Sequence, residues 1–332
     1  MSDVVVIGAG AWGCTFARVA ALAGARVSLA CRTAEQAAVL RGTRHDRIHL
    51  GDVALPDDVV VTHIDDPAAL DAASIIVAAI PSRAVAQAAV DLAPRLPEGA
   101  GVLSLTKGLE PGTGRVLSQA WADALPPGTP FAVLSGPNHA EEIALGQPAA
   151  AVVSGDPGLA ARVQDAVSGP VFRIYVNDDL VGVELCGAAK NVIALAAGMS
   201  DGLGFGDNAK AALITRGLAE MSRLGASAGA RDSTFRGLAG MGDLIATCTS
   251  RHSRNRRAGE MIARGLPADA VEREIGQVVE GLATVRALLV RAAAAQVELP
   301  ISEQVAAAAF DGRSPEECLR SLMSREIGRA HV

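Results

Sequence analysis

The stretch VVVIGAGAWG at residues 4–13 constrains the fold more than any other short segment of this chain. An apolar, β-branched run leads into a G-x-G-x-x-G pattern, and a helical stretch follows. In such a unit Gly8 permits the tight turn, Gly10 lets the backbone approach a pyrophosphate, and Gly13 lets the helix pack closely on the sheet. The N–H groups at the helix start then face the anion. We therefore expect a bound dinucleotide, the alternative being an ordinary glycine turn of an α/β protein.

Further apolar runs alternate with helical stretches through the first half of the chain. Strands that are apolar on both faces belong to parallel sheets covered by helices on both sides, so this alternation predicts an α/β, Rossmann-type fold with a mostly parallel, doubly wound sheet. Near residue 178 the strand signals stop. The expected strands lie at residues 4–8, 26–32, 58–62, 74–80, 101–108, 130–136 and 149–155, and the expected later helices at 182–199, 208–225, 256–264, 278–295 and 302–310.

These patterns divide the chain into two expected domains. Residues 1–178 form a dinucleotide-binding Rossmann-like domain, and residues 179–332 form an all-helical domain that binds substrate and carries catalysis. With 332 residues, half of them hydrophobic, the chain is long enough to build two cores.

Charge and cysteine content exclude several functional classes. The net charge of −6 argues against general binding to nucleic acid or to an anionic membrane. The five cysteines are scattered without zinc-type spacing, which indicates free thiols in a reducing compartment and no metal site. The strand-like N-terminus leaves no room for a signal peptide, and no apolar run approaches the roughly 18 residues of a spanning helix. We expect a cytoplasmic protein without membrane insertion, and a homodimer is the oligomer we consider.

The second expected strand ends in Cys31-Arg32, where an NAD-preferring site usually carries an acidic residue for the ribose hydroxyls. An arginine there can pair with a ribose phosphate or stack on adenine, or it can be a solvated residue at a strand end. The missing acid tips the expected cofactor toward NADPH over NADH.

Residues suited to a small anion follow two other strands and recur in the helical half. Ligands of open parallel sheets bind beyond the carboxyl ends of the strands, where Lys107, Gly136 and Asn138 lie. The segment SRHSRNRR at 250–257 gathers four arginines, which can be a solvated basic face, a nucleic-acid patch or a phosphate clamp. The acidic net charge and the lack of interleaved aromatic residues weaken the nucleic-acid option. Ser253, Arg254 and Asn255 offer donors that suit one small phosphate ester.

One lysine stands within GAAKNVIALAAG at residues 187–198, a helical pattern of small apolar residues. Lys190 either extends along its methylene stem to the surface or is buried with a partner and a function. A partly desolvated ammonium has a lowered pKa and can exchange a proton near neutral pH.

Together these motifs resemble the bacterial NAD(P)-dependent glycerol-3-phosphate dehydrogenase family over essentially the whole chain. The resemblance implies reversible reduction of dihydroxyacetone phosphate to sn-glycerol 3-phosphate for phospholipid synthesis. The blocks that carry it are GAGAWG (8–13), TKG (106–108), SGPNHAEEIA (135–144), ELCGAAKNVIALAAG (184–198), DGLGFGDNAKAALITRGLAEM (201–221), AGMGDLIATCTSRHSRNRRAG (239–259) and VVEG (278–281).

By this resemblance Lys190 is the proton donor and acceptor at the C2 oxygen of the substrate. The positions that match the family's triose phosphate site are Lys107, Gly136, Asn138, Lys190, Asp243, Ser253, Arg254 and Asn255. The positions that match its cofactor site, beyond the three glycines, are Ala11, Trp12, Arg32, His49, Lys107, Ala140, Arg254, Val278 and Glu280. Ala11 and Asn138 stand where serine or threonine is common, and the sequence around His49 departs from the family pattern.

Two other functions fit a chain of this type. One is a different two-domain dehydrogenase, for β-hydroxyacids or of the ketopantoate type, which would not need the phosphate clamp. The other is a Rossmann protein that senses NADP(H) without turnover, which would need neither Lys190 nor Lys107. The fold alone does not distinguish these functions.

Overall fold

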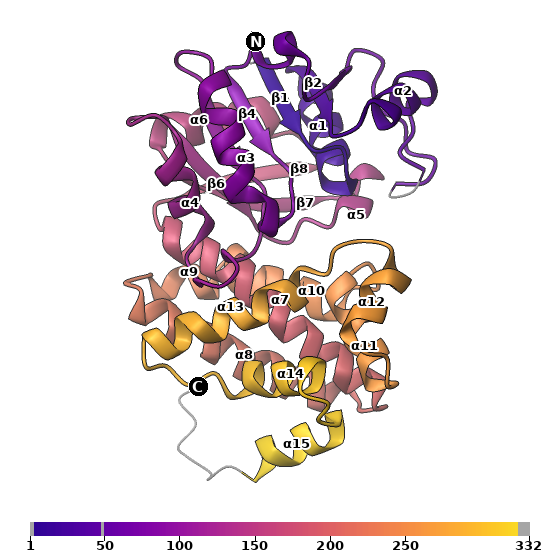
Figure 1. The fold of residues 1–332 in the computed structure, drawn as a ribbon, viewed down its shortest axis with the longest axis vertical. Helices are drawn as coiled ribbons and strands as arrows, with labels where there is room; N and C mark the ends of the chain where they lie inside the picture. The colour runs from indigo at the N-terminus through magenta and orange to yellow at the C-terminus, as the bar shows by residue number, and fades with distance from the viewer. Residues whose placement is uncertain (1–2, 48–49, 325–332) are drawn as a thin grey trace.

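The computed structural model describes residues 3–47 and 50–324 (Figure 1). In Figure 1 the α/β half of the chain lies above the helical half, and the sheet points one end of its strands toward the helices. The strands of the described residues form one eight-stranded sheet with the order β3-β2-β1-β4-β5-β6-β7-β8. They are β1 (Asp3–Ile7), β2 (Arg26–Cys31), β3 (Val60–His63), β4 (Ile75–Ala78), β5 (Gly101–Ser104), β6 (Phe131–Ser135), β7 (Ala149–Gly155) and β8 (Phe172–Asn177).

The pairing confirms the expected mostly parallel, doubly wound sheet. Neighbouring strands from β3 to β6 are parallel, β6 and β7 are antiparallel, and β7 and β8 are parallel again. Strand β8 was not expected from the sequence. Its segment FRIYVN buries Phe172 and Ile174 and exposes Arg173 and Tyr175, so it lacks the doubly apolar pattern of the central strands.

Helices cover both faces of the sheet because successive strand residues point to opposite sides. Val4 and Val6 of β1 belong to the core cluster on one face with Phe16 of α1, whereas Val5 packs with Trp121 of α4 on the other face. The helices of this half are α1 (Ala11–Leu22), α2 (Ala34–Thr43), α3 (Val85–Leu92), α4 (Leu117–Ala124), α5 (Ala140–Ala144) and α6 (Pro157–Val167), with 3₁₀ turns η1 (Pro67–Leu70), η2 (Ser82–Ala84) and η3 (Ala93–Arg95).

The helical half is built around α7 (Leu180–Gly202), which is buried from Gly182 to Ser200. The remaining elements are α8 (Asp207–Ser227), α9 (Asp232–Arg236), the π-turn η4 (Leu238–Gly242), α10 (Asp243–Thr249), α11 (Arg254–Ala263), α12 (Ala268–Ile275), α13 (Glu280–Ala294), α14 (Pro300–Phe310) and α15 (Pro315–Met323). Each expected later helix has a counterpart among them. The short elements α9, η4, α10, α12 and α15 were not expected.

Helix α7 is long and apolar enough to cross a membrane by length and composition alone. This differs from the expectation that no segment reaches that length. The most apolar 18-residue window of α7 is 89% buried inside the protein, so the helix has the environment of a core helix. Its apolarity is accounted for by packing against α8, α10, α11 and α13.

The two halves share apolar and polar contacts. Val133 of β6 and Val152 of β7 belong to the same core cluster as Val183 and Val192 of α7. At one edge of this boundary, the carboxylate of Glu184 on α7 accepts hydrogen bonds from the backbone N–H (2.8 Å) and the hydroxyl (2.5 Å) of Ser118, in the first turn of α4. Strands β6 and β7 therefore share one apolar core with the helices around α7.

Candidate active site

Lys190 is buried near the middle of α7 and does not reach the surface. Only 5% of the residue is exposed. Its Nζ donates hydrogen bonds to Asp243 Oδ1 at 2.5 Å and to Thr247 Oγ1 at 2.7 Å. Both partners lie on α10, four residues apart, and therefore on one face of that helix. The lysine within the apolar pattern thus has a buried partner, which excludes the surface-extending alternative.

A second lysine enters the same cluster from the α/β half. Lys107, in the loop after β5, donates to Asp243 Oδ2 at 2.8 Å. The same ammonium donates to Asn138 Oδ1 at 2.7 Å and to the carbonyl oxygen of Gly136 at 3.0 Å, both in the loop after β6. Five residues that the sequence analysis assigned to the substrate site therefore lie in one contact network, which bridges the two halves of the chain.

Burial and charge set the protonation of this network. Burial, reinforced by the nearby charge of Lys107, lowers the pKa of Lys190 from 10.5 to about 7, against the opposing effect of Asp243. Burial by itself would raise the pKa of Asp243, but the two lysines outweigh it and hold that pKa below its usual value. Asp243 is therefore an anion at neutral pH, while Lys190 is poised to gain or lose a proton.

The residues of the segment Ser253–Asn255 differ in burial and in how many of their polar groups already have hydrogen-bond partners. Ser253 caps α11 by accepting a hydrogen bond from the backbone N–H of Arg256, and it is buried. Asn255 is also buried: its amide donates to Asn191 Oδ1 and its oxygen accepts from the N–H of Gly281. Arg254 is exposed and donates one hydrogen bond to the carbonyl of Val278. Its guanidinium keeps further N–H donors for an anion.

The remaining arginines of the basic segment divide between internal pairing and exposure. Arg256 forms ion pairs with Asp201 and Glu260 and is occupied within the helical half. Arg251 and Arg257 are exposed. The segment is therefore not a uniform basic surface, and Arg254 is the arginine in it that contacts the VVEG segment.

The glycine loop has the shape of a phosphate cradle. Gly8 has φ +103°, and a Cβ there would lie 2.4 Å from the carbonyl oxygen of Ala79. A Cβ on Gly13 would lie 1.8 Å from the carbonyl oxygen of Gly8, whereas a Cβ on Gly10 would meet nothing within 4 Å. Helix α1 begins at Ala11 with no side-chain cap from the described residues. Its first N–H groups therefore suit a pyrophosphate, so these residues fit a dinucleotide.

The other expected cofactor residues lie at strand ends and at the start of α13. Arg32 is exposed directly after β2. Its carbonyl oxygen lies 3.2 Å from Nε2 of His63, while its guanidinium has no hydrogen-bond or ion-pair partner within the described residues. Ala140 begins α5, and its carbonyl accepts from Thr15. Glu280 accepts hydrogen bonds from the backbone N–H and the hydroxyl of Ser82, after β4. Trp12 is half-buried in the first turn of α1, and His49 lies outside the described residues.

Sequence reasoning missed two residues of this region. Thr247 contacts Lys190 directly, and its position four residues after Asp243 was a usable signal. His139 lies between Asn138 and Ala140, with Nε2 3.3 Å from the carbonyl oxygen of Ala246 on α10. No sequence pattern indicated that contact, because it joins segments 107 residues apart.

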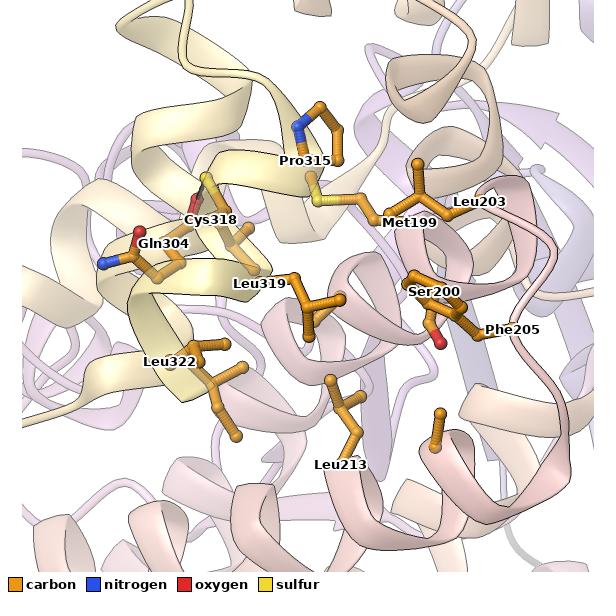
Figure 2. Close-up of a pocket in the computed structure, with 14 residues that line it drawn as sticks. Met199, Ser200, Leu203, Phe205, Leu213, Gln304, Pro315, Cys318, Leu319 and Leu322 are labelled. Atoms are coloured by element: carbon orange, nitrogen blue, oxygen red, sulfur yellow. Dashed lines mark hydrogen bonds between the residues drawn. The ribbon is translucent and has the colours of Figure 1, made fainter. Parts of the chain in front are cut away.

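A separate apolar pocket lies between α7, α8, α14 and α15, and Figure 2 shows Met199, Leu203, Leu213 and Leu319 lining it. Neither Lys190 nor Asp243 lines this pocket. Its lining has no charged side chain, in contrast to the cluster around Lys190.

The glycine loop after β1 suits a dinucleotide, and the helical half holds a buried lysine. This combination is that of a two-domain nicotinamide-dependent dehydrogenase. The chain matches two family models: residues 3–159 match the NAD-dependent glycerol-3-phosphate dehydrogenase N-terminus, and residues 179–320 match the C-terminus. The chain belongs to the NAD-dependent glycerol-3-phosphate dehydrogenase family.

Individual relatives agree with the family models. The chain is 44% identical to glycerol-3-phosphate dehydrogenase [NAD(P)+] of Desulfitobacterium hafniense (strain Y51), over 100% of this chain and 93% of that protein. It is 46% identical to the enzyme of the same name from Geobacillus thermodenitrificans (strain NG80-2), over 98% and 95%. The crystal structure of glycerol-3-phosphate dehydrogenase from Coxiella burnetii superimposes with a TM-score of 0.93 at 34% identity, covering 98% of this chain and 99% of that one.

The alternative of a ketopantoate-type dehydrogenase is represented by solved structures that are less similar to this chain. A ketopantoate reductase of the PanE/ApbA family from Ralstonia eutropha JMP134 aligns with a TM-score of 0.59 and 17% identity, over 96% of this chain and 99% of that one. At that identity the likeness extends to the fold alone. The glycerol-3-phosphate dehydrogenases are the nearer relatives in both sequence and structure.

Proposed function

We propose that this chain catalyses the reversible reduction of dihydroxyacetone phosphate to sn-glycerol 3-phosphate with NADPH or NADH, and so supplies glycerophospholipid synthesis. The observation that carries the proposal is the Lys190–Asp243–Lys107 cluster. It combines a lysine with a pKa of about 7, a buried counterion and a second cation at the junction of the two halves.

Lys190 donates a proton to the C2 oxygen in the reduction and accepts it in the oxidation. A bound nicotinamide supplies or takes up the hydride. Asp243 orients the ammonium of Lys190 and stabilises its charged form, and Thr247 provides a second fixed acceptor. Because Lys190 is held on α7 and both of its partners on α10, the proton donor is preorganised before substrate arrives.

The substrate is held by residues of both halves. Lys107, Gly136 and Asn138 contribute from the loops after β5 and β6. Arg254 presents free N–H donors to the phosphate. Its neighbours Ser253 and Asn255 hold that arginine in position, and their unused donors and acceptors also bind the substrate. This phosphate clamp distinguishes a phosphorylated triose from a plain keto acid.

The cofactor site is proposed to combine the glycine loop with residues from neighbouring strand ends and from α13. Gly8, Gly10, Ala11, Trp12 and Gly13 hold the pyrophosphate end, and Arg32 faces the adenosine ribose, which favours NADPH. The residues proposed to line the rest of the site are His49, Lys107, Ala140, Arg254, Val278 and Glu280.

We also propose the domain division 1–178 and 179–332, a cytoplasmic location and a homodimeric assembly. The division is supported by the end of β8 at Asn177 and the start of α7 at Leu180. All five cysteines are free, which suits a reducing compartment. The mass of the purified protein in solution tests the assembly.

The decisive experiment is the initial rate of NADPH oxidation and, separately, of NADH oxidation with dihydroxyacetone phosphate. We expect rapid oxidation that is lost when unphosphorylated dihydroxyacetone replaces the ester. The ratio of the two rates measures the cofactor preference. Cofactor binding without any oxidation would contradict the proposal, and β-keto acids would then be the next substrates to test.

A further inference from the structure

The loop from β6 to α5 carries one polar ring for which the proposed function leaves no role. His139 follows Asn138, which accepts a hydrogen bond from Lys107, and it precedes the first residue of α5. The ring is half-buried, and its Nε2 lies 3.3 Å from the carbonyl oxygen of Ala246. Because a carbonyl oxygen only accepts, Nε2 must carry the hydrogen of this contact.

Ala246 occupies the turn of α10 that presents both helical partners of Lys190. Asp243 and Thr247 lie three residues before and one residue after it, and the Thr247 hydroxyl donates to the carbonyl of Asp243 at 2.6 Å. A small rotation or slide of this turn would therefore move the carboxylate and the hydroxyl together. The position of α10 thus determines the environment of the Lys190 ammonium.

The start of α10 is not fixed by regular helix geometry. The π-turn η4 directly precedes Asp243, and π-turns are rare and locally irregular. The loop that carries His139 also lies against this turn: a Cβ on Gly242 would stand 3.8 Å from Cδ of Pro137. The loop after β6 therefore contacts both the turn before Asp243 and the carbonyl beside Thr247.

We propose that His139 is a positioning residue, whose hydrogen bond to Ala246 holds α10 in register with Lys190. This inference rests on the proposed function, since it concerns the proton donor of that reaction. The hydrogen bond also links the loop that carries Asn138 to the helix that carries Asp243. The two anchors of the lysine cluster, one in each half of the chain, are thereby held at a fixed spacing.

The charged groups that act on the ring are Lys190 on α7, Lys107 after β5 and Asp243 on α10. Burial, followed by the positive charge of Lys190, lowers the pKa of His139. The ring is therefore neutral at pH 7 and donates through Nε2, with Nδ1 as the unprotonated nitrogen. A neutral amide with a donor at the same reach can replace it.

The test compares His139→Leu, which keeps bulk but removes the donor, with His139→Gln, whose amide nitrogen can occupy the place of Nε2. We expect His139→Leu to lower kcat for dihydroxyacetone phosphate about three- to tenfold, the loss typical of one hydrogen bond. The KM for NADPH should stay unchanged. We expect His139→Gln to recover most of the lost kcat.

A second readout reports on Lys190 without turnover. The lysines of the chain are Lys107, Lys190 and Lys210, so ¹³C-lysine labelling gives few signals, and Lys190→Arg assigns the relevant one. In His139→Leu the carboxylate of Asp243 is held less firmly, so the midpoint of the Lys190 titration should move to lower pH. In His139→Gln it should stay at the wild-type value.

Each outcome separates the two proposals. Wild-type kcat and an unmoved Lys190 titration in His139→Leu would overturn the positioning role. Equal losses in both variants with an unmoved titration would indicate mere packing, and would overturn it as well. An inactive wild-type protein would contradict the proposed function, while the titration would still test the contact.

Discussion

Lys107 and Asp243 lie in different halves of the chain, and their charged atoms are 2.8 Å apart across the junction. The other oxygen of the same carboxylate is 2.5 Å from Lys190. One anion thus compensates two cations, and the cluster carries a net positive charge when both lysines are protonated. An incoming phosphate ester meets a site of opposite charge.

Lys190→Ala should remove turnover and leave cofactor binding intact. Loss of a general acid typically costs about 10²- to 10⁴-fold in rate. The measurements are kcat with dihydroxyacetone phosphate and the Kd for NADPH from fluorescence. Lys210→Ala is the control, because Lys210 lies on α8 and pairs with Asp201 in the last turn of α7, not with Asp243. Equal losses of turnover and NADPH affinity in Lys190→Ala would contradict the role as proton donor.

The two directions of the reaction should depend on pH with opposite signs. Reduction needs the ammonium of Lys190, so its kcat should fall as pH rises through about 7. Oxidation needs the free amine, so its kcat should rise through the same range. The midpoint belongs to the coupled cluster and should match the ¹³C titration of Lys190. Both profiles moving in the same direction would argue against a single lysine acting in both directions.

Asp243→Asn should lower both the pKa of Lys190 and the stability of the protein. The carboxylate raises that pKa, and its removal leaves two lysines facing each other. Breaking a buried pair on one side costs about 3–5 kcal/mol of unfolding free energy. Urea unfolding and the Lys190 titration measure the two effects. Asp269→Asn, which breaks an exposed pair with Arg273, should change neither.

Arg32→Ala should weaken NADPH selectively. A charge-assisted hydrogen bond to a phosphate contributes about 1.5–3 kcal/mol, so kcat/KM for NADPH should fall about 10- to 100-fold, while that for NADH changes little. The exposed Arg236→Ala on α9 serves as the control. Equal losses with both cofactors would show that Arg32 does not read the ribose phosphate.

Glu184→Gln should become more stable relative to wild type as pH rises. Burial raises the pKa of Glu184 from 4.5 to about 7. The folded state therefore holds this proton more tightly than the unfolded chain, and the associated stability is lost as pH rises between those values. A shift of this size corresponds to about 3 kcal/mol. Urea midpoints at pH 5 and pH 8 measure it, with the exposed Glu303→Gln as control. A gap between variant and wild type that is independent of pH would contradict the buried titration.

The sheet and the long helices could be predicted because their signals are local. Doubly apolar strands and 3.6-residue periodicity survive in short windows of sequence. Strand β8 was not predicted because it lies at the sheet edge and alternates polar with apolar residues. The short elements η4 and α10 escaped because their geometry depends on tertiary packing around Asp243.

The site was predictable in its residue types but not in its connections. The burial of Lys190 could be suspected from its small apolar neighbours. That Asp243 holds both Lys190 and Lys107 could not, because those residues are 53 and 136 positions away. The contact between His139 and α10 has the same origin in tertiary structure.

The interior shared by the sheet and the helices bears on how such chains diversify. Val133 and Val152 point from β6 and β7 into the cluster that surrounds α7. A helical half transplanted from another dehydrogenase would meet these side chains in the wrong shape and leave voids or clashes. The boundary between the halves is itself a packed core. New substrate specificity is therefore easier to reach by changes around the lysine cluster than by exchange of whole halves.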